Sequence, residues 1–394
     1  MPDTPTDSHD MEPPEWLRYA GPAQALAHLG LKSAGEIARL VAEMHATIAS
    51  TPGLSLKPWP KDIHHSQAPL PYRIVTGSFD MLAKLVGTVE VGGVELQDPR
   101  WRRLNAALNG IAGDKLANWK NRLATSMQLV DLDGHALEFD SQASGHVVFI
   151  HGLCHSELDW RSSSHQDYIH QLENKGYQAL WLRYNTGLNI FRNGKMLADS
   201  LEALHPHNHP LILIGHSMGG LVIRSACAYA QQQQHEWLND LTHATYIGSP
   251  HLGSPLERSG NLVNSLIGIT PYARPFTRLG NIRSQGIKDL RHGYILEEDA
   301  INGEKHQRDV RSALEPLHTT TQHLLIASRL KNAMKQNWVG DGLVPVNSAL
   351  GEHSRAGMNL SAPYLHKEFI DELGHVAMLS DARVYNLLSQ YIVV

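Results

Sequence analysis

The sequence predicts an α/β fold in which a mostly parallel sheet is flanked by helices. From about residue 123 onward, short apolar runs of strand length alternate with amphipathic stretches of helix length. The run at residues 211–214 is continuously apolar, which is typical of a strand buried on both faces of a parallel sheet. Before residue 122 the apolar residues recur at helical spacing instead. We therefore expect a helical N-terminal extension over residues 1–122 and the sheet domain over residues 123–394.

Three amphipathic helices are expected in the extension, over residues 35–50, 78–89 and 101–112. In the last of them, Leu104, Leu108 and Ile111 recur at intervals of four and three residues and so share one face. The first two are separated by a proline-rich stretch that is typical of an extended connector. No motif in the extension assigns it a role.

The sheet domain starts with a hairpin signal, because two strand-like stretches, 126–131 and 136–140, flank the turn Asp133-Gly134. The strands expected after it cover residues 146–150, 177–183, 211–214, 244–247, 323–328 and 367–370, and the helices cover residues 166–175, 193–204, 218–232 and 377–391. A long connection at about 250–322 interrupts this alternation and holds an apolar helix candidate at 262–269. A connection of this length inside a compact domain is usually functional, so we expect a lid there.

Composition excludes several classes of protein. The chain of 394 residues has a net charge of −5, and its Lys and Arg residues are spread out, which argues against a nucleic-acid partner. It has only two cysteines, so no disulfide framework is implied. The polar N-terminus does not match a secretory signal, and no apolar run reaches the roughly 18–20 residues that span a bilayer. We expect a cytoplasmic protein, with a peripheral membrane contact and the oligomeric state left open.

The strongest local motif is Gly215-His216-Ser217-Met218-Gly219, which lies between the apolar strand at 211–214 and a long helix. A serine on such a sharp strand-to-helix turn needs glycines two residues away on each side, because side chains there would collide with the adjoining strand and helix. The following helix directs its N-terminus at negative charge that develops beside the serine. The pattern predicts that Ser217 is a nucleophile. The alternative is a glycine-rich turn in which the serine caps the helix.

A nucleophilic serine also needs two N–H groups that bind the oxyanion. The first expected donor is the N–H of Met218, which directly follows the serine. The second is expected in the loop after the strand 146–150, where Gly152 in His151-Gly152-Leu153-Cys154 would let the backbone turn the Leu153 N–H toward the site. The alternative for this loop is a simple turn at the end of a strand.

The base and its carboxylate partner are expected after the serine in the order Asp or Glu, then His. His375 is the best base, because it alone among the histidines lies between the last strand and the last helix. Asp341 is the best acid, because Gly340 and Gly342 would let its short side chain turn inward. Asp371 is the fallback acid, although it would have to fold back sharply to reach His375.

Taken together, these segments resemble the α/β-hydrolase superfamily and, within it, bacterial lipase- and esterase-like proteins. The segments that carry the resemblance are Gly-His-Ser-Met-Gly-Gly at 215–220, His-Gly-Leu-Cys at 151–154, Arg-Tyr-Asn-Thr-Gly at 183–187, Gly-Ser-Pro-His at 248–251 and Gly-Asp-Gly-Leu-Val-Pro at 340–345. The resemblance covers residues 125 to 394 and is most specific at the serine turn and the acid loop. The polar pair His155 and Ser156 after the oxyanion loop departs from the pattern.

The resemblance implies a catalytic triad of Ser217, Asp341 and His375, with Leu153 and Met218 as oxyanion donors, and it implies no cofactor and no metal. The expected activity is hydrolysis of carboxylic esters through an acyl-enzyme. An apolar lid at 262–269 would favour lipid-like ester substrates. Two alternatives stay open. One is an acyltransferase that uses the same acyl-enzyme, and the other is a non-catalytic interaction protein.

Two other features of the sequence could indicate a site, a group of three histidines and a cysteine. His205, His207 and His209 alternate and could suggest a metal, but no carboxylate or cysteine lies nearby in the sequence, which favours an exposed loop. Cys154 could be a nucleophile, but nothing around it indicates a lowered pKa, which favours a small buried packing residue.

Overall fold

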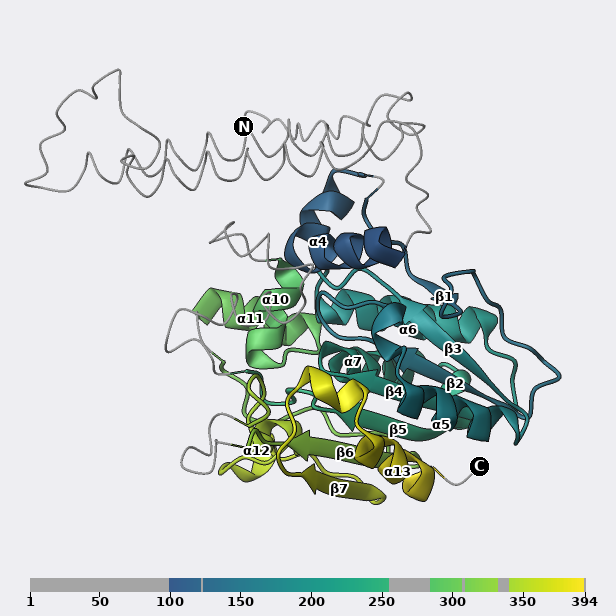
Figure 1. The fold of residues 1–394 in the computed structure, drawn as a ribbon. Coiled ribbons are helices and arrows are strands. Elements are labelled where there is room, and N and C mark those ends of the chain that lie inside the picture. The colour runs from purple at the N-terminus through teal and green to yellow at the C-terminus, as the bar shows by residue number, and fades with distance from the viewer. Residues whose placement is uncertain (1–98, 122, 255–283, 307–308, 332–339, 393–394) are drawn as a thin grey trace, which may run out of the picture. The chain divides into compact units, whose positions relative to one another are not determined.

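The computed structural model describes residues 99–121, 123–254, 284–306, 309–331 and 340–392. The chain divides into two compact units, Met1–Val94 with Lys115–Ala124 and Glu95–Asp114 with Thr125–Val394, and the second unit carries the sheet (Figure 1). The helices expected at 35–50, 78–89 and 262–269 lie outside the described residues. The domain boundary near residue 122 and the lid stay predictions.

Within the described residues, the core of the second unit is a seven-stranded sheet in the order β1-β3-β2-β4-β5-β6-β7. Of these strands, only β1 runs antiparallel to its neighbour, β3, and the other pairs are parallel. The strands are β1 (Gln128–Val130), β2 (Gly145–Ile150), β3 (Tyr177–Arg183), β4 (Leu211–His216), β5 (Leu241–Ile247), β6 (Gln322–Ser328) and β7 (Leu365–Ile370). The predicted mostly parallel sheet is confirmed.

Helices lie on both faces of the sheet, which is why its central strands are apolar throughout. Every residue of β2 and of β4 is buried. The described helices are α4 (Pro99–Asn118), α5 (Ser163–Glu173), α6 (Ile190–Leu204), α7 (Met218–Gln233), α8 (Trp237–Asp240), α10 (Gln285–His292), α11 (Glu297–His306), α12 (Val346–Ala349) and α13 (Ala382–Tyr391). None of them is long and apolar enough to cross a membrane.

The two faces are covered by different helices. On one face, α5 and α13 pack over alternate strand residues such as Phe149 and Ile214 in one hydrophobic cluster. Phe149 also stacks on Trp181, with ring centroids 5.6 Å apart, and lies 5.1 Å from the ring of Trp160. On the other face, α7 packs on β4 and β5, and α6 packs on α7 (Figure 1). The long helix that follows Ser217 is therefore fixed between the sheet and α6.

Three elements differ from the expected pattern. The second hairpin strand is reduced to a single bridge between Val130 and Ala136. The helix expected at 101–112 is longer, because α4 continues past a kink at Ala112, whose φ is −137°. The expected C-terminal helix is split: a short 3-10 turn ends at Leu379, and α13 starts after Asp381, whose side chain accepts the Arg383 N–H. An aspartate at an N-cap explains that break.

A buried carboxyl group joins α10 to the start of α6. Asp289 is 3% exposed, and its Oδ2 accepts hydrogen bonds from the Ile190 N–H (2.9 Å) and the Asn189 side-chain amide (3.1 Å). Burial disfavours the carboxylate and raises the pKa of Asp289 to about 7. The folded protein therefore holds a proton on Asp289 between about pH 4 and pH 7 that the unfolded chain releases.

We predict that Asp289 makes the protein less stable as pH rises from about 4 to about 7. A raised carboxyl pKa stabilises the fold only while the group is protonated, and this contribution is lost as pH passes through the folded-state pKa. Thermal unfolding of wild type and Asp289→Asn between pH 5 and pH 8 should show the variant gaining in Tm relative to wild type with rising pH. Asp167→Asn, which changes an exposed carboxylate on α5, is the control. Parallel curves for wild type and Asp289→Asn would contradict the prediction.

Candidate active site

Ser217 occupies a strained turn between β4 and α7. Its φ of 55° and ψ of −121° are unfavourable for a residue with a side chain. Although Ser217 stands at the N-cap position of α7, its side chain makes no capping hydrogen bond. The helix-cap interpretation therefore does not describe what this hydroxyl does. Strained backbone of this kind clusters at functional sites.

Crowding explains the two glycines around the serine. A Cβ on Gly215 would lie 2.5 Å from the Gly220 nitrogen, and a Cβ on Gly219 would lie 2.2 Å from the carbonyl oxygen of Ile150. Both obstacles are backbone atoms and cannot rotate away. The helix α7 thus starts in close contact with the end of β2, as the glycine spacing in the sequence predicts.

Asp341 and His375 form a buried pair. His375 Nδ1 lies 2.7 Å from Asp341 Oδ2, and their side chains are 5% and 1% exposed. The other oxygen of Asp341 accepts the N–H groups of Leu343 (2.9 Å) and Val344 (2.8 Å). With Asp341 as acceptor, the proton on His375 resides on Nδ1 and leaves Nε2 able to accept a proton.

Backbone hydrogen bonds gather this pair and Ser217 at the carboxyl edge of the sheet. The Ser217 N–H donates to the carbonyl of Ile247, at the end of β5, over 2.8 Å. The next residue, Gly248, is so close to the pair that a Cβ there would lie 3.3 Å from both Asp341 Oδ2 and His375 Nδ1. Ligands bind at this edge in open α/β sheets.

His216 joins the serine turn to His375, and it was not singled out in the sequence. Its Nε2–H donates to the carbonyl of His375 (3.1 Å), and the two rings lie 4.8 Å apart between centroids. Burial, followed by the charges of His375 and His155, holds the pKa of His216 well below its usual value. His216 is therefore neutral. The only sequence signal was its place directly before Ser217.

Asp371 lies elsewhere. Its carboxylate is about half exposed and pairs with Arg329 at 3.1 Å. Of the two acids considered from the sequence, only Asp341 contacts His375.

Leu153 and Met218 are both buried next to the serine turn. A Cβ on the neighbouring Gly152 would lie 3.0 Å from Ser217 Cβ, so the loop after β2 passes directly beside Ser217. Met218 is the first residue of α7. Within the described residues, neither the Leu153 N–H nor the Met218 N–H donates to a protein acceptor. Buried N–H groups normally have partners, so these two are available to a ligand oxygen.

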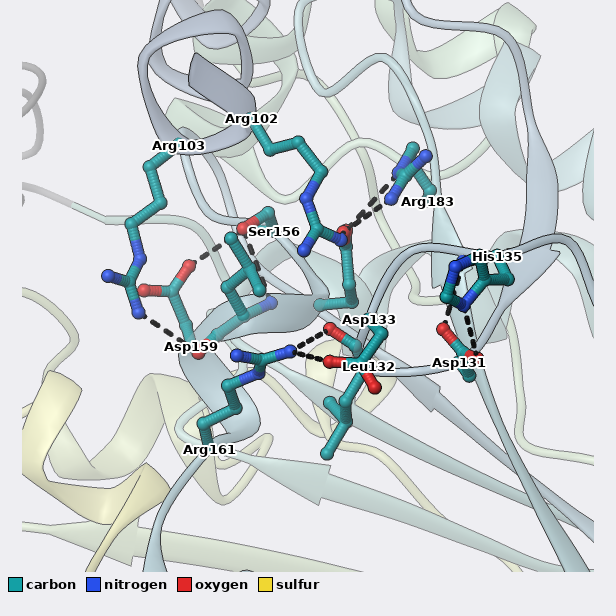
Figure 2. A network of polar contacts seen from close by, with 12 residues as sticks. Arg102, Arg103, Asp131, Leu132, Asp133, His135, Ser156, Asp159, Arg161 and Arg183 are labelled. Carbon is teal, nitrogen blue, oxygen red and sulfur yellow. Dashed lines mark hydrogen bonds and ion pairs between the residues drawn. The ribbon is translucent and has the colours of Figure 1, made fainter. Parts of the chain in front are cut away.

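The polar residues after the oxyanion loop make local contacts within the same stretch of chain. The Ser156 side chain accepts the Leu158 N–H, and the Ser156 N–H donates to Asp159 Oδ2 (2.8 Å), which caps the 3-10 helix Glu157–Trp160 (Figure 2). His155 Nδ1 lies 3.2 Å from the same oxygen, Asp159 Oδ2. The departure from the family pattern at 155–156 is thus a local cap.

The other clusters from the sequence look different in three dimensions. Burial raises the pKa of the Cys154 thiol to about 12, so this cysteine is not a thiolate. His205 is buried and packs edge-on against His146 and Phe139 instead of lying exposed. Within the described ranges, no group of three or more His, Cys, Asp or Glu residues could hold a metal ion.

A family model described as "Putative serine esterase (DUF676)" matches residues 140–279, which include the serine turn and the oxyanion loop. A comparison with curated proteins finds no match. The match therefore covers the serine turn and the loop after β2, while Asp341 and His375 lie beyond it.

Several solved structures are similar to this chain. Lipase BlEst2 from Bacillus licheniformis, in its mature form, is 18% identical, with 68% of this chain and 98% of that chain covered and a TM-score of 0.43. Carboxylesterase CesB from Bacillus subtilis is 11% identical, with 74% and 98% covered and a TM-score of 0.39. The type II thioesterase YbtT of the yersiniabactin pathway is 16% identical, with 67% and 97% covered and a TM-score of 0.40.

The resemblance seen in the sequence is confirmed by the sheet order, the strained serine turn and the matching family segment. Residues 140–279 match a putative serine esterase family, and the sheet order and the strained serine turn are those of an α/β-hydrolase fold.

Proposed function

We propose that this protein is a serine hydrolase that cleaves carboxylic esters through an acyl-enzyme on Ser217. The observation that carries the proposal is the buried Asp341–His375 pair at the same sheet edge as the strained, uncapped Ser217. The family description of residues 140–279 supports the same chemistry. No cofactor is needed, because the three side chains and two N–H groups supply every proton and charge contact of the reaction.

Hydrolysis proceeds in two steps. His375 Nε2 accepts the proton of Ser217 Oγ as this oxygen bonds to the ester carbonyl carbon, and the electron pair moves to the carbonyl oxygen. The N–H groups of Leu153 and Met218 bind that oxyanion. The bond to the alcohol then breaks, and the alcohol leaves with the proton from His375. A water molecule repeats the sequence on the acyl-serine and releases the carboxylic acid.

Asp341 has two effects in this scheme. Its carboxylate holds the Nδ1 tautomer of His375, and it stabilises the imidazolium that forms when His375 takes the serine proton. Because two backbone N–H groups fix the carboxylate from the other side, the ring of His375 has one preferred orientation. His216 holds the backbone of the same histidine.

We predict that Ser217→Ala abolishes hydrolysis of p-nitrophenyl esters and labelling by a fluorophosphonate, because the acyl-accepting oxygen is gone. Ser328→Ala is the matched control, since Ser328 is also buried at the carboxyl end of a strand, β6, and should leave both signals unchanged. Circular dichroism establishes that both variants fold. Near-wild-type turnover by Ser217→Ala would refute the assignment of Ser217 as the nucleophile. A wild-type protein that neither turns over esters nor takes the label would favour a non-catalytic interaction protein.

We predict that Asp341→Asn lowers kcat by roughly 10³- to 10⁴-fold with little change in KM, because an asparagine favours the wrong tautomer of the base. Asp371→Asn makes the same chemical change at the other acid considered and should stay within about twofold of wild type. Steady-state kinetics of both variants test the choice. Equal losses in the two variants, or a larger loss in Asp371→Asn, would show that Asp341 is not the acid.

The lipid-like substrate class is inferred from the apolar stretch at 262–269, which lies outside the described residues. We predict that kcat/KM for p-nitrophenyl octanoate exceeds that for the acetate at least tenfold. Two buried methylene groups at about 0.8 kcal/mol each already give roughly that factor. A preference for acetate would contradict a lipid-like substrate. Formation of a transferred ester as the main product when an alcohol is added would instead indicate an acyltransferase.

A further inference from the structure

We propose that the first part of α4, residues 99–114, holds the oxyanion loop His151-Gly152-Leu153-Cys154 in its working position, and that Arg102 and Glu157 are positioning residues for the Leu153 N–H. The inference rests on the proposed function, because it assigns a purpose to the loop that carries one oxyanion donor. It gives a role to a helix that precedes every strand of the sheet. Two independent contacts lead to it, one at Cys154, where the loop ends, and one at Glu157 on the 3-10 helix that follows the loop.

The first contact is close packing between α4 and Cys154. A Cβ on Gly110 would lie 2.3 Å from Cys154 Sγ and 2.9 Å from the Cys154 nitrogen, so only glycine allows this approach. On the same helix, the carbonyl of Ala107 lies 3.8 Å from Cys154 Sγ. The helix backbone therefore rests directly on the residue that follows Leu153.

Cys154 needs such support because its backbone is strained. Its φ is 62°, in the left-handed region that residues with side chains avoid. Its N–H donates to Thr186 Oγ1 (3.3 Å) from the neighbouring loop after β3. A strained residue persists only when the structure around it over-determines its conformation. Here α4 and Thr186 enclose Cys154 from two sides and fix the preceding peptide, that of Leu153.

The second contact is a buried ion-pair cluster on the 3-10 helix that continues the oxyanion loop. The Glu157 side chain is fully buried, and its Oε1 accepts from Arg102 Nη1 of α4 (2.7 Å) and from Arg183 Nη2 at the end of β3 (2.5 Å) (Figure 2). Burial acts to raise the pKa of Glu157, but the hydrogen bond and charge of Arg183 outweigh it, so the pKa lies below its usual value. Glu157 is therefore an anion clamped between two cations at neutral pH.

Helix α4 also contacts the loop after β3. The carbonyl of Gly113 accepts a hydrogen bond from the Asn185 side-chain amide nitrogen (2.9 Å), and Oδ1 of the same Asn185 side chain accepts the Gly187 N–H (3.0 Å). The carbonyl of Gly110 accepts the hydroxyl of Ser284, which caps α10 (2.6 Å). Helix α4 is thus attached to the loop after β3 and to the start of α10, and it links the oxyanion loop to both of them.

The contact between α4 and the oxyanion loop matters for catalysis because an oxyanion donor acts only within about 3 Å of the developing charge. A small shift of the Leu153 peptide would weaken transition-state binding while leaving ground-state binding nearly unchanged. A merely structural role for α4 predicts a different result, namely a loss of stability with kcat unchanged in the protein that remains folded. The split between kcat and KM separates the two roles.

The test uses the full chain with Arg102→Met, Arg102→Lys and Gly110→Ala. Loss of the Arg102 cation, or a methyl group pressed against Cys154, should lower kcat for a p-nitrophenyl ester roughly tenfold to hundredfold and change KM by less than about threefold. Affinity for an alkyl trifluoromethyl ketone, a transition-state analogue, should weaken by a similar factor. Arg102→Lys keeps the positive charge beside Glu157 and should recover most of kcat. Arg355→Met, at an exposed arginine, is the control and should behave as wild type.

Backbone hydrogen exchange provides a second readout that needs no activity. Exchange at residues 151–160 should become faster in Arg102→Met and Gly110→Ala than in wild type and Arg355→Met. If folded Arg102→Met and Gly110→Ala keep kcat within twofold and exchange unchanged, the inference is overturned while the proposed function stands. If Arg102→Met does not fold, Gly110→Ala decides the outcome, because it disturbs the contact with Cys154 without touching the ion pair. Absent Ser217-dependent turnover in wild type would instead overturn the proposed function, and exchange would then judge the loop contact by itself.

Discussion

The strained backbone of Ser217 is the constraint on which the rest of the site depends. A conformation of this kind costs about 1–3 kcal/mol, and it survives here because the chain is held on both sides of it. The Ser217 N–H is fixed to the end of β5, and Gly219 brings α7 against the carbonyl of Ile150 at the end of β2. Three strands and one helix therefore together hold Ser217 in a backbone conformation that it would otherwise avoid. The same contacts place the Met218 N–H and the Leu153 loop beside the serine.

His375 is coupled to this turn through His216. A neutral, buried imidazole that donates to the His375 carbonyl makes the position of His375 depend on the residue next to Ser217. Asp341 then fixes the ring of the base through its side chain, while the His375 N–H donates to the Asp341 carbonyl over 3.0 Å. The two loops are thus joined by backbone and side chain together, so neither side chain can reorient without disturbing the other loop.

Local patterns in the sequence were sufficient for most of the sheet and for choosing Asp341 and His375, which the structure places in contact. Continuous apolar runs predicted the buried strands, and the glycine spacing around Ser217 predicted a crowded turn. The second hairpin strand and the continuous last helix were not predicted correctly, because a tight turn signal does not fix how many residues pair and because Asp381 starts a new helix. Glu157 and Arg102 gave no recognisable signal in the sequence, and His216 gave only its place directly before Ser217. Their roles arise from contacts across 159 and 55 residues of chain, which no periodicity encodes.

Helix α4 is joined to the loop after β2 by buried charged groups and not by apolar contacts alone. These groups are Arg102, Glu157 and Arg183. Burial lowers the pKa of Arg102, a sign that its cation gives up hydration on folding. A buried ion pair is often no more stabilising than apolar side chains of the same volume, because that loss of hydration offsets the attraction. Apolar contacts, however, are non-directional and tolerate sliding. Hydrogen-bonded charges have defined distances and angles, so they fix the register between α4 and the loop after β2. A catalytic loop that must keep one peptide N–H in place benefits from that geometry even where the net gain in stability is small.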